Sequence, residues 1–266
     1  MHERVCVKRR ISSLSFDSIP TTSTGGANRR RGCASVAAAG PESADTGAEP
    51  ATSVCISSYH PNAELLSSPA LAVLFTTIRD RRTTQCEYVS CSDRLMNILA
   101  EEGLARLATP STVETPCGSF NGLAPAPTST VCGVDIMRSG GILLEAVRKI
   151  APDSKTAKVL VQRCEETAEP TLYYSKLPPD ISSCNVLLCD PMLATGGSAL
   201  MAIEVLKDAG VQEESILFLN VLSCPEGLQK LARHTPGVRI LTAALDRGLN
   251  DQKFIVPGLG DYGDRY

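Results

Sequence analysis

The chain has 266 residues, of which 43% are hydrophobic, and this is enough for one sizeable domain with an ordinary core. Its formal net charge of −3 argues against a nucleic-acid-binding protein, because such proteins usually carry a basic face. No apolar run approaches the roughly 18 residues of a membrane span, and no secretory signal opens the sequence. Small molecules are therefore the expected partners, with neither nucleic acid nor membrane among them.

The eleven cysteines are scattered along the chain. No Cys-x-x-Cys pair occurs and the three histidines do not cluster with cysteines, so a zinc site is not expected. We interpret the cysteines as buried, reduced thiols of an intracellular protein and expect a cytoplasmic location.

Residues 1–55 differ in composition from the rest of the chain. They are rich in Ser, Thr, Ala and Gly, and basic clusters lie at residues 8–10 and 29–31. Such a segment cannot bury enough apolar surface to offset the entropy lost on ordering, which predicts a disordered extension. An organelle-targeting presequence is the alternative, because the first forty residues are rich in Arg and Ser and contain few acidic residues. Residues 56–266 are then expected to form the folded domain.

The first expected elements of that domain are two helices. Residues 65–78 are apolar and predict the first helix. Ser92 is expected to cap the second, with Asp93 in its first turn and apolar residues at helical spacing after it. Residues 110–130 are rich in Pro, Gly, Ser and Thr, which predicts a long loop or a hairpin.

From residue 131 onward, expected strands alternate with expected helices. The strands are expected over 131–137, 157–162, 185–189, 216–222 and 238–243. The helices are expected over 140–150, 197–209 and 225–234, and residues 172–176 are interpreted as one arm of a protruding hairpin. The alternation predicts an α/β fold in which a mostly parallel twisted sheet is flanked by helices and preceded by the N-terminal helices. In such sheets, ligands bind beyond the carboxyl ends of the strands.

The segment with the clearest chemistry is Asp-Pro-Met-Leu-Ala-Thr-Gly-Gly-Ser, residues 190–198. An apolar strand ends in Asp190, a turn with two glycines follows, and an amphipathic helix begins. The first amides of a helix lack internal partners and the helix dipole is positive there, so this junction predicts a phosphate site. The glycines allow close approach of the backbone, and Thr195 and Ser198 add hydroxyl donors.

Two common phosphate-binding patterns do not fit this segment. The Walker pattern with its Lys is missing, and so is the Gly-x-Gly-x-x-Gly of dinucleotide-binding folds. An acid placed ahead of Thr195 suits a ribose 5-phosphate, because the acid can accept from ribose hydroxyls while the loop binds the phosphate. An ordinary strand–turn–helix junction is the alternative interpretation.

Residues 190–198 resemble the signature loop of uracil phosphoribosyltransferases, which have Asp-Pro where most phosphoribosyltransferases have two adjacent acids. Residues 133–140, 162–167, 246–250 and 254–266 resemble further segments of the same family, in the same order. The resemblance covers about residues 65–266. It implies a pentosyltransferase of pyrimidine salvage that converts uracil and phosphoribosyl pyrophosphate (PRPP) to UMP and pyrophosphate. Mg²⁺ is expected to bind with the pyrophosphate of PRPP, with no direct metal site on the protein.

The resemblance also implies roles for individual residues. Arg138, Asp190 and Asp261 are expected to be catalytic. The expected PRPP-binding residues are these three with Arg163, Pro191, Met192, Leu193, Ala194, Thr195, Gly196, Gly197 and Ser198. The expected uracil-binding residues are Ile255, Gly260, Asp261 and Tyr262, of which Ile255 and Gly260 would act through backbone groups. The planar fork of an Arg side chain suits phosphate oxygens.

Some members of the family are activated by GTP, and Arg94 resembles one of the basic residues involved. Arg79, Arg81 and Arg82 are interpreted as a solvated charge run. Family members are usually dimers or tetramers, so a homo-oligomer is expected, and they usually continue with Phe-Gly-Thr after Asp-Arg-Tyr.

A non-catalytic regulator or scaffold of the same fold is the alternative from another functional class. A degenerate relative would be expected to lose Gly260 and Asp261, which this chain keeps. A phosphoribosyltransferase for another base is a third hypothesis, against which Asp190-Pro191 argues.

Overall fold

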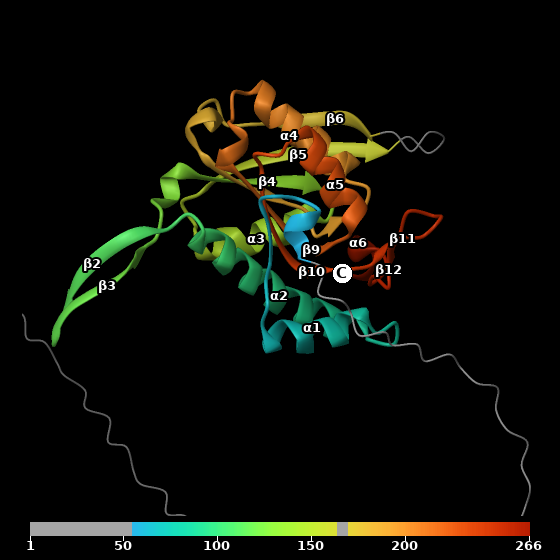
Figure 1. Ribbon diagram of the computed structural model, residues 1–266, viewed down its shortest axis with the longest axis horizontal. Coiled ribbons are helices and arrows are strands. Elements are labelled where there is room, and N and C mark those ends of the chain that lie inside the picture. Colours follow the sequence, from blue (N-terminus) through green and yellow to red (C-terminus); the bar gives the residue numbers. More distant parts are fainter. Residues whose placement is uncertain (1–54, 164–169) are drawn as a thin grey trace, which may run out of the picture. The chain divides into compact units, whose positions relative to one another are not determined.

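The computed structural model describes residues 55–163 and 170–266. The eight strands of its main sheet are β1 (Ala63–Leu65), β4 (Val131–Met137), β5 (Lys155–Arg163), β6 (Pro170–Lys176), β7 (Asn185–Cys189), β8 (Met192–Leu193), β9 (Ile216–Ser223) and β10 (Arg239–Leu245). Their order is β1-β10-β9-β7-β4-β5-β6, with β8 beside β9. All neighbours are parallel except β5 and β6, so the predicted mostly parallel sheet is confirmed (Figure 1).

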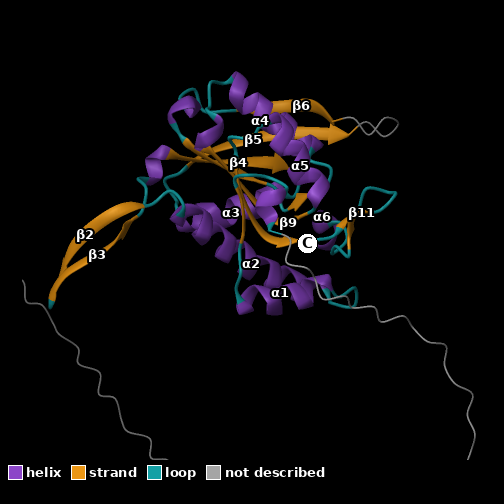
Figure 2. Ribbon diagram, in the orientation of Figure 1, coloured by secondary structure: helices purple, strands orange, loops and turns teal. Residues whose placement is uncertain are grey.

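Helices cover both faces of this sheet (Figure 2). On one face lie α1 (Pro69–Arg79), α2 (Gln85–Ala105) and α3 (Gly140–Ile150), and on the other lie α4 (Gly197–Asp208) and α5 (Pro225–His234). Because strand side chains alternate between faces, Leu217 and Leu219 of β9 pack in the first layer, whereas Ile216 and Phe218 pack in the second. Single-turn helices span Ile56–Ser58, Thr128–Thr130, Ile181–Ser183 and Glu213–Ser215.

The predicted strands and helices after residue 131 are confirmed closely. β4, β7, α3 and α5 have the expected bounds, and the other predicted strands and α4 differ by one or two residues at an end. The sequence patterns do not predict β1, β8, the small pair β11 (Gly248–Leu249) and β12 (Ile255–Val256), or α6 (Tyr262–Arg265). These elements are too short to show a periodicity of their own.

The start of α2 corrects the predicted cap at Ser92. The helix begins at Gln85, and Thr84 caps it through a capping box in which Thr84 and Glu87 each accept a hydrogen bond from the other's backbone amide. Ser92 is instead fully buried inside the helix. The Thr-x-x-Glu spacing is the sequence signal that the prediction missed. The first helix, which was expected from residue 65, begins only at Pro69, because Ser68 caps α1.

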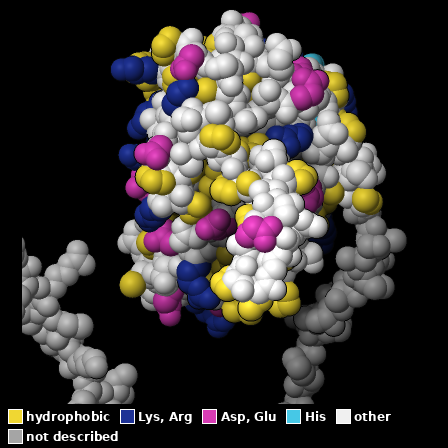
Figure 3. All heavy atoms as spheres, turned by 90° about the vertical axis from the view of Figure 1, so that its left-hand side faces the viewer, with side chains coloured by type: hydrophobic (Ala, Val, Ile, Leu, Met, Phe, Trp, Pro, Cys, Tyr) yellow, Lys and Arg dark blue, Asp and Glu magenta, His cyan; other side chains and the backbone are white. Residues whose placement is uncertain are grey.

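The protruding hairpin lies in the segment 110–130 and not at 172–176. β2 (Thr109–Thr115) and β3 (Gly118–Ala124) pair with each other and extend away from the main sheet (Figure 1). Residues 172–176 belong to β6, the antiparallel edge strand of the main sheet, which corrects the interpretation as a protruding arm. Figure 3, which faces the hairpin side, shows acidic and basic side chains interspersed on this face.

The described cysteines are not uniformly buried, contrary to the prediction. Cys132, Cys184, Cys189 and Cys224 are buried, whereas Cys55, Cys86 and Cys117 are exposed. Within the two described ranges, no helix combines the length and the apolar character needed to cross a membrane.

Candidate active site

A cavity of about 510 Å³ opens at the carboxyl ends of the neighbouring strands β4, β5 and β7. Its lining includes Arg138, Ser139, Gln162, Asp190, Ser198 and Asp261. These residues come from distant parts of the sequence, and the topology of the parallel sheet brings them to one edge. The cavity lies where ligands of such sheets bind.

A second cavity of about 240 Å³ adjoins the first, because Ser139, Asp190 and Asp261 line both. The rest of its lining is Met192, Ala194, Lys253, Phe254, Ile255, Gly260 and Tyr262. One wall is thus the loop after β7, and the other is the C-terminal segment. Two ligands that react with each other can bind side by side in the two cavities, with the carboxylates of Asp190 and Asp261 where the cavities meet.

The loop between β7 and α4, residues 190–196, is held by the sheet and by α5. Its residues in β8 pair with β9, and Gly196 caps α4 with a φ of 74°, a left-handed value that suits glycine. Gly227 of α5 packs against the loop so closely that a Cβ atom there would lie 2.6 Å from the carbonyl oxygen of Ala194. The first amides of α4, which have no partner within the helix, are therefore supported by a well-packed backbone.

Arg138 follows β4 and is exposed at the first cavity. No ion pair joins it to another residue in the described part of the chain. A permanent positive charge that faces a cavity without an acidic partner suits an anionic ligand.

Asp135 lies in β4 below the turn that carries Arg138. Only 4% of it is exposed, and burial raises the pKa of its carboxyl to about 6, against the opposing charge of Lys158. Gly140 packs on top of it, since a Cβ atom at Gly140 would lie 2.9 Å from Asp135 Oδ1 and 2.2 Å from the carbonyl oxygen of Cys189. The turn after β4 is thereby pressed against the residue that precedes Asp190.

Replacing Gly140 by Ala is expected to destabilise the protein by about 1–3 kcal/mol, because the new methyl group would overlap a backbone oxygen that cannot rotate away. Gly141→Ala is the matched control. There the new Cβ atom would lie 3.3 Å from Asp135 Oδ2, and alanine favours the helix. Urea unfolding of both variants measures the difference. Equal stability of the two variants would contradict the tight packing of Gly140.

The base loop, which we name after its expected role and define as residues 255–260, contributes to one wall of the second cavity. Ile255 at its start and Gly260 at its end both line that cavity. Gly258 and Gly260 have φ values of 65° and 85°, left-handed conformations that glycine adopts without strain. The loop therefore turns sharply, and Gly260, which has no side chain, lines the cavity with its backbone.

The short helix α6 follows the base loop and packs on α2. Asp261 caps it, with Oδ1 accepting from the Asp264 amide at 3.0 Å, and lines both cavities. Tyr262 is 1% exposed, its ring lies 5.6 Å from that of Tyr88 in α2, and burial raises the pKa of Tyr262. Tyr266 Oη donates to Asp93 at 2.6 Å. These contacts fix the position of the Asp261 carboxylate.

Most of the predicted site residues meet at the two cavities. Those that line at least one cavity are Arg138, Asp190, Met192, Ala194, Ser198, Ile255, Gly260, Asp261 and Tyr262. Four further residues of the loop after β7 and the start of α4 are buried, namely Pro191, Leu193, Gly196 and Gly197, and Thr195 beside them is half-buried. Arg163 ends β5, but its side chain lies outside what the structure describes. Arg94 is exposed on α2 and lines neither cavity.

Several lining residues were not predicted, notably Ser139, Gln162, Lys253 and Phe254. Ser139, Gln162 and Phe254 lie inside segments that resemble the family, and this resemblance is the sequence signal that could have identified them. Phe254 is 54% exposed at the second cavity, where a flat hydrophobic ring suits contact with a planar ligand. Among the described residues, no group of three His, Cys, Asp or Glu side chains could hold a metal ion unaided.

Comparisons with known proteins give this site its context. The sequence model of the family Uracil phosphoribosyltransferase matches residues 65–266. The chain is 47% identical to the uracil phosphoribosyltransferase of Lachancea kluyveri over 195 residues, which cover 73% of this chain and 89% of the relative. It is 44% identical to that of Dictyostelium discoideum over 212 residues, or 79% and 97% of the two chains. The solved AQ2163 protein from Aquifex aeolicus matches with a TM-score of 0.66 and 30% identity, over 76% of this chain and 96% of that one. The chain therefore belongs to the uracil phosphoribosyltransferase family.

Proposed function

We propose that the two adjoining cavities are the active site in which this enzyme joins uracil to the ribose of PRPP. The observation that carries the proposal is the shared lining: the expected PRPP residues and the expected uracil residues border two cavities that meet at Asp190 and Asp261. A reaction between two bound substrates requires this adjacency of their sites.

The sugar phosphate fits the first cavity and the loop after β7. The 5′-phosphate would bind the amides at the start of α4, together with the hydroxyls of Thr195 and Ser198. Asp190 would accept hydrogen bonds from the ribose hydroxyls. Arg138 would bind the pyrophosphate, and Arg163 is proposed as a second contact by resemblance to the family.

Uracil fits the second cavity. Backbone amide and carbonyl groups of Ile255 and Gly260 can pair with the oxygen and N–H edges of uracil at once. Cytosine has a different donor and acceptor pattern, so its binding would leave buried polar groups unpaired. Tyr262 and Phe254 would pack near the base.

The reaction forms a bond between uracil N1 and ribose C1 as the bond from C1 to the pyrophosphate oxygen breaks, and the proton of uracil N1 passes to solvent or to the departing pyrophosphate. Positive charge develops on the ribose while negative charge develops on the leaving group. Arg138 can neutralise the leaving pyrophosphate, and the carboxylates of Asp190 and Asp261, which line the first cavity, would lie beside the reacting sugar. Positioning supplies much of the remaining effect.

Magnesium fits this arrangement as a partner of the substrate. Mg²⁺ is commonly bound by one or two carboxylates together with substrate phosphates, and Asp190 and Asp261 are the two carboxylates at the first cavity. When bound, the ion supplies charge neutralisation at the pyrophosphate. A dimer or tetramer and a GTP effector site that includes Arg94 belong to the proposal by resemblance to the family, and a cytoplasmic location belongs to it because of the cysteine usage.

The proposal is tested by the formation of labelled UMP from radiolabelled uracil, PRPP and Mg²⁺ with the purified full chain. UMP is expected with uracil, while cytosine and hypoxanthine should give no nucleotide. Removal of Mg²⁺ by EDTA should stop the reaction. If no nucleotide forms from any base, with or without GTP, the enzyme assignment fails and the non-catalytic regulator becomes the better account.

A further inference from the structure

An ion pair lies directly behind the base loop. Arg79, the last residue of α1, donates from Nη1 and Nη2 to the two carboxylate oxygens of Asp246, both at 2.8 Å. Asp246 follows β10 and its side chain is 6% exposed, while that of Arg79 is 25% exposed. The sequence pattern suggests that Arg79 is part of a solvated charge run. The structure corrects this, because the Arg79 side chain is mostly buried and paired with Asp246.

Both members of this pair also bind the backbone of Gly258, in the middle of the base loop. Asp246 Oδ2 accepts from the Gly258 amide at 2.8 Å, and Arg79 Nη1 donates to the Gly258 carbonyl oxygen at 2.8 Å. The two polar backbone groups of one residue are thus satisfied by a single ion pair. A Cβ atom at Gly258 would lie 2.1 Å from the Ile255 carbonyl oxygen, so the loop is tightly folded here.

We infer that Arg79 and Asp246 are positioning residues that set the affinity of the enzyme for its base. The inference rests on the proposed function of the second cavity. Ile255 and Gly260 flank Gly258 and line that cavity. Backbone groups that read a base must be held closely in place, because a small displacement misaligns every hydrogen bond of the set.

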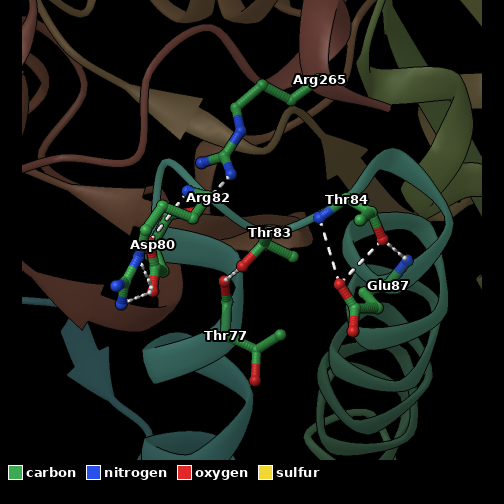
Figure 4. A network of polar contacts seen from close by, with 7 residues as sticks. All are labelled: Thr77, Asp80, Arg82, Thr83, Thr84, Glu87 and Arg265. Carbon is green, nitrogen blue, oxygen red and sulfur yellow. Dashed lines mark hydrogen bonds and ion pairs between the residues drawn. The ribbon is translucent and has the colours of Figure 1, made fainter.

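Arg265 holds the next residue of the loop in a similar way. Its Nη1 atom donates to the carbonyl oxygens of Leu259 at 2.7 Å and Ile78 at 2.6 Å, and its Nη2 atom donates to that of Asp80 at 2.8 Å. Figure 4 shows Arg265 directed at the connection between α1 and α2. Within that connection, a hydrogen bond from Thr83 to Thr77 and the Thr84–Glu87 capping box order the chain, whereas Arg82 pairs with the Asp80 carboxylate at the exposed surface. The end of α1 thus supports two consecutive residues of the base loop.

The Arg79–Asp246 pair holds the base loop mainly through the directions of its hydrogen bonds and less through its charges. A largely buried ion pair contributes little net stability, because desolvation offsets the Coulomb attraction. A planar guanidinium, however, can bind two carboxylate oxygens and a carbonyl oxygen in fixed directions, which a lysine cannot do. Replacing Arg79 by Lys therefore keeps the charge and removes the fork.

Arg79→Lys is expected to raise the KM for uracil about tenfold, which corresponds to the loss of one charge-assisted hydrogen bond. The KM for PRPP and kcat should stay within about threefold, since the first cavity is not touched. Asp246→Asn, which also leaves the Gly258 amide without its charged acceptor, should raise the KM for uracil further. Steady-state kinetics with each substrate varied in turn measures the split. A purely structural role would affect both substrates alike.

Arg82→Lys is the matched control. Arg82 forms the same kind of fork with Asp80, but its side chain is 84% exposed and, among the described residues, no hydrogen bond or ion pair joins it to the base loop. This variant should retain the KM of the unchanged enzyme for both substrates. An equal rise of the uracil KM in Arg79→Lys and Arg82→Lys, or no rise in either, would overturn the inference.

Hydrogen–deuterium exchange of the full chain tests the same inference without catalysis. Arg79→Lys should speed exchange of the amides in the base loop, where the Gly258 amide donates to Asp246, and Arg82→Lys should not. Unchanged exchange in Arg79→Lys would overturn the positioning role. Absence of UMP formation by the unchanged chain would instead overturn the proposed function, and the exchange result would still decide whether the pair holds the loop.

Discussion

Replacing Asp261 by Asn is expected to lower kcat/KM for UMP formation by about two to three orders of magnitude, with little change in the thermal midpoint. Asp261 lines both cavities, so its charge faces the point where sugar, pyrophosphate and base would meet. Removal of one such electrostatic group from an active site typically lowers the rate by about 10²–10³. Asn is a good helix cap, so it can keep the hydrogen bond to the Asp264 amide and preserve α6.

Asp264→Asn is the control for that variant. Asp264 is an exposed acid in the same short helix and lines neither cavity, so the same chemical change should leave the kinetics within about twofold. Steady-state kinetics and thermal unfolding of both variants provide the comparison. Near-normal activity of Asp261→Asn would remove this carboxylate from the proposed mechanism.

Arg138→Gln is expected to raise the KM for PRPP by about 10- to 100-fold, because a charged hydrogen bond to a phosphate group contributes about 1.5–3 kcal/mol. The KM for uracil should change much less, since Arg138 lines the first cavity and not the second. A fall in kcat should accompany the change if the guanidinium also neutralises the leaving pyrophosphate. Kinetics with PRPP and uracil varied separately measures these effects.

Arg148→Gln gives the matched comparison on α3. Arg148 pairs with Glu145 in an exposed ion pair three residues apart, with a side chain that is 52% exposed. Loss of such a surface pair should change stability by less than about 1 kcal/mol and leave both KM values intact. If the two Arg variants showed the same kinetics, the assignment of Arg138 to the pyrophosphate would be wrong.

The sequence predicts the central sheet well because its strands are short, continuous apolar runs buried on both faces. β4 and β7 begin and end at the expected residues for this reason. The prediction of the cap of α2 failed, because Ser92 met the general preference for a cap while Thr84 and Glu87 carried the more specific pattern. A polar residue inside a helical pattern can belong either to a cap or to a buried position, and the spacing to Glu87 decides between them.

The parts of the candidate site that are formed by contiguous residues can be predicted from the sequence, whereas the parts that depend on contacts between distant residues cannot. The loop after β7 is predictable because the acid, the glycines and the hydroxyls that define a phosphate site are contiguous in the sequence. The Arg79–Asp246 pair joins residues 167 positions apart, and no local pattern marks either as a partner of Gly258. The same holds for Gly140 and Gly227, whose role is visible only in the distance of an added Cβ atom from a backbone oxygen.

A crystal structure of the full chain with bound UMP would test the account most directly. The account predicts the 5′-phosphate at the amides of residues 195–198 and the uracil ring in the second cavity, with its polar edge against the backbone of Ile255 and Gly260. The ribose should bridge the two cavities beside Asp190 and Asp261. A phosphate bound away from the start of α4, or a base outside the second cavity, would contradict it.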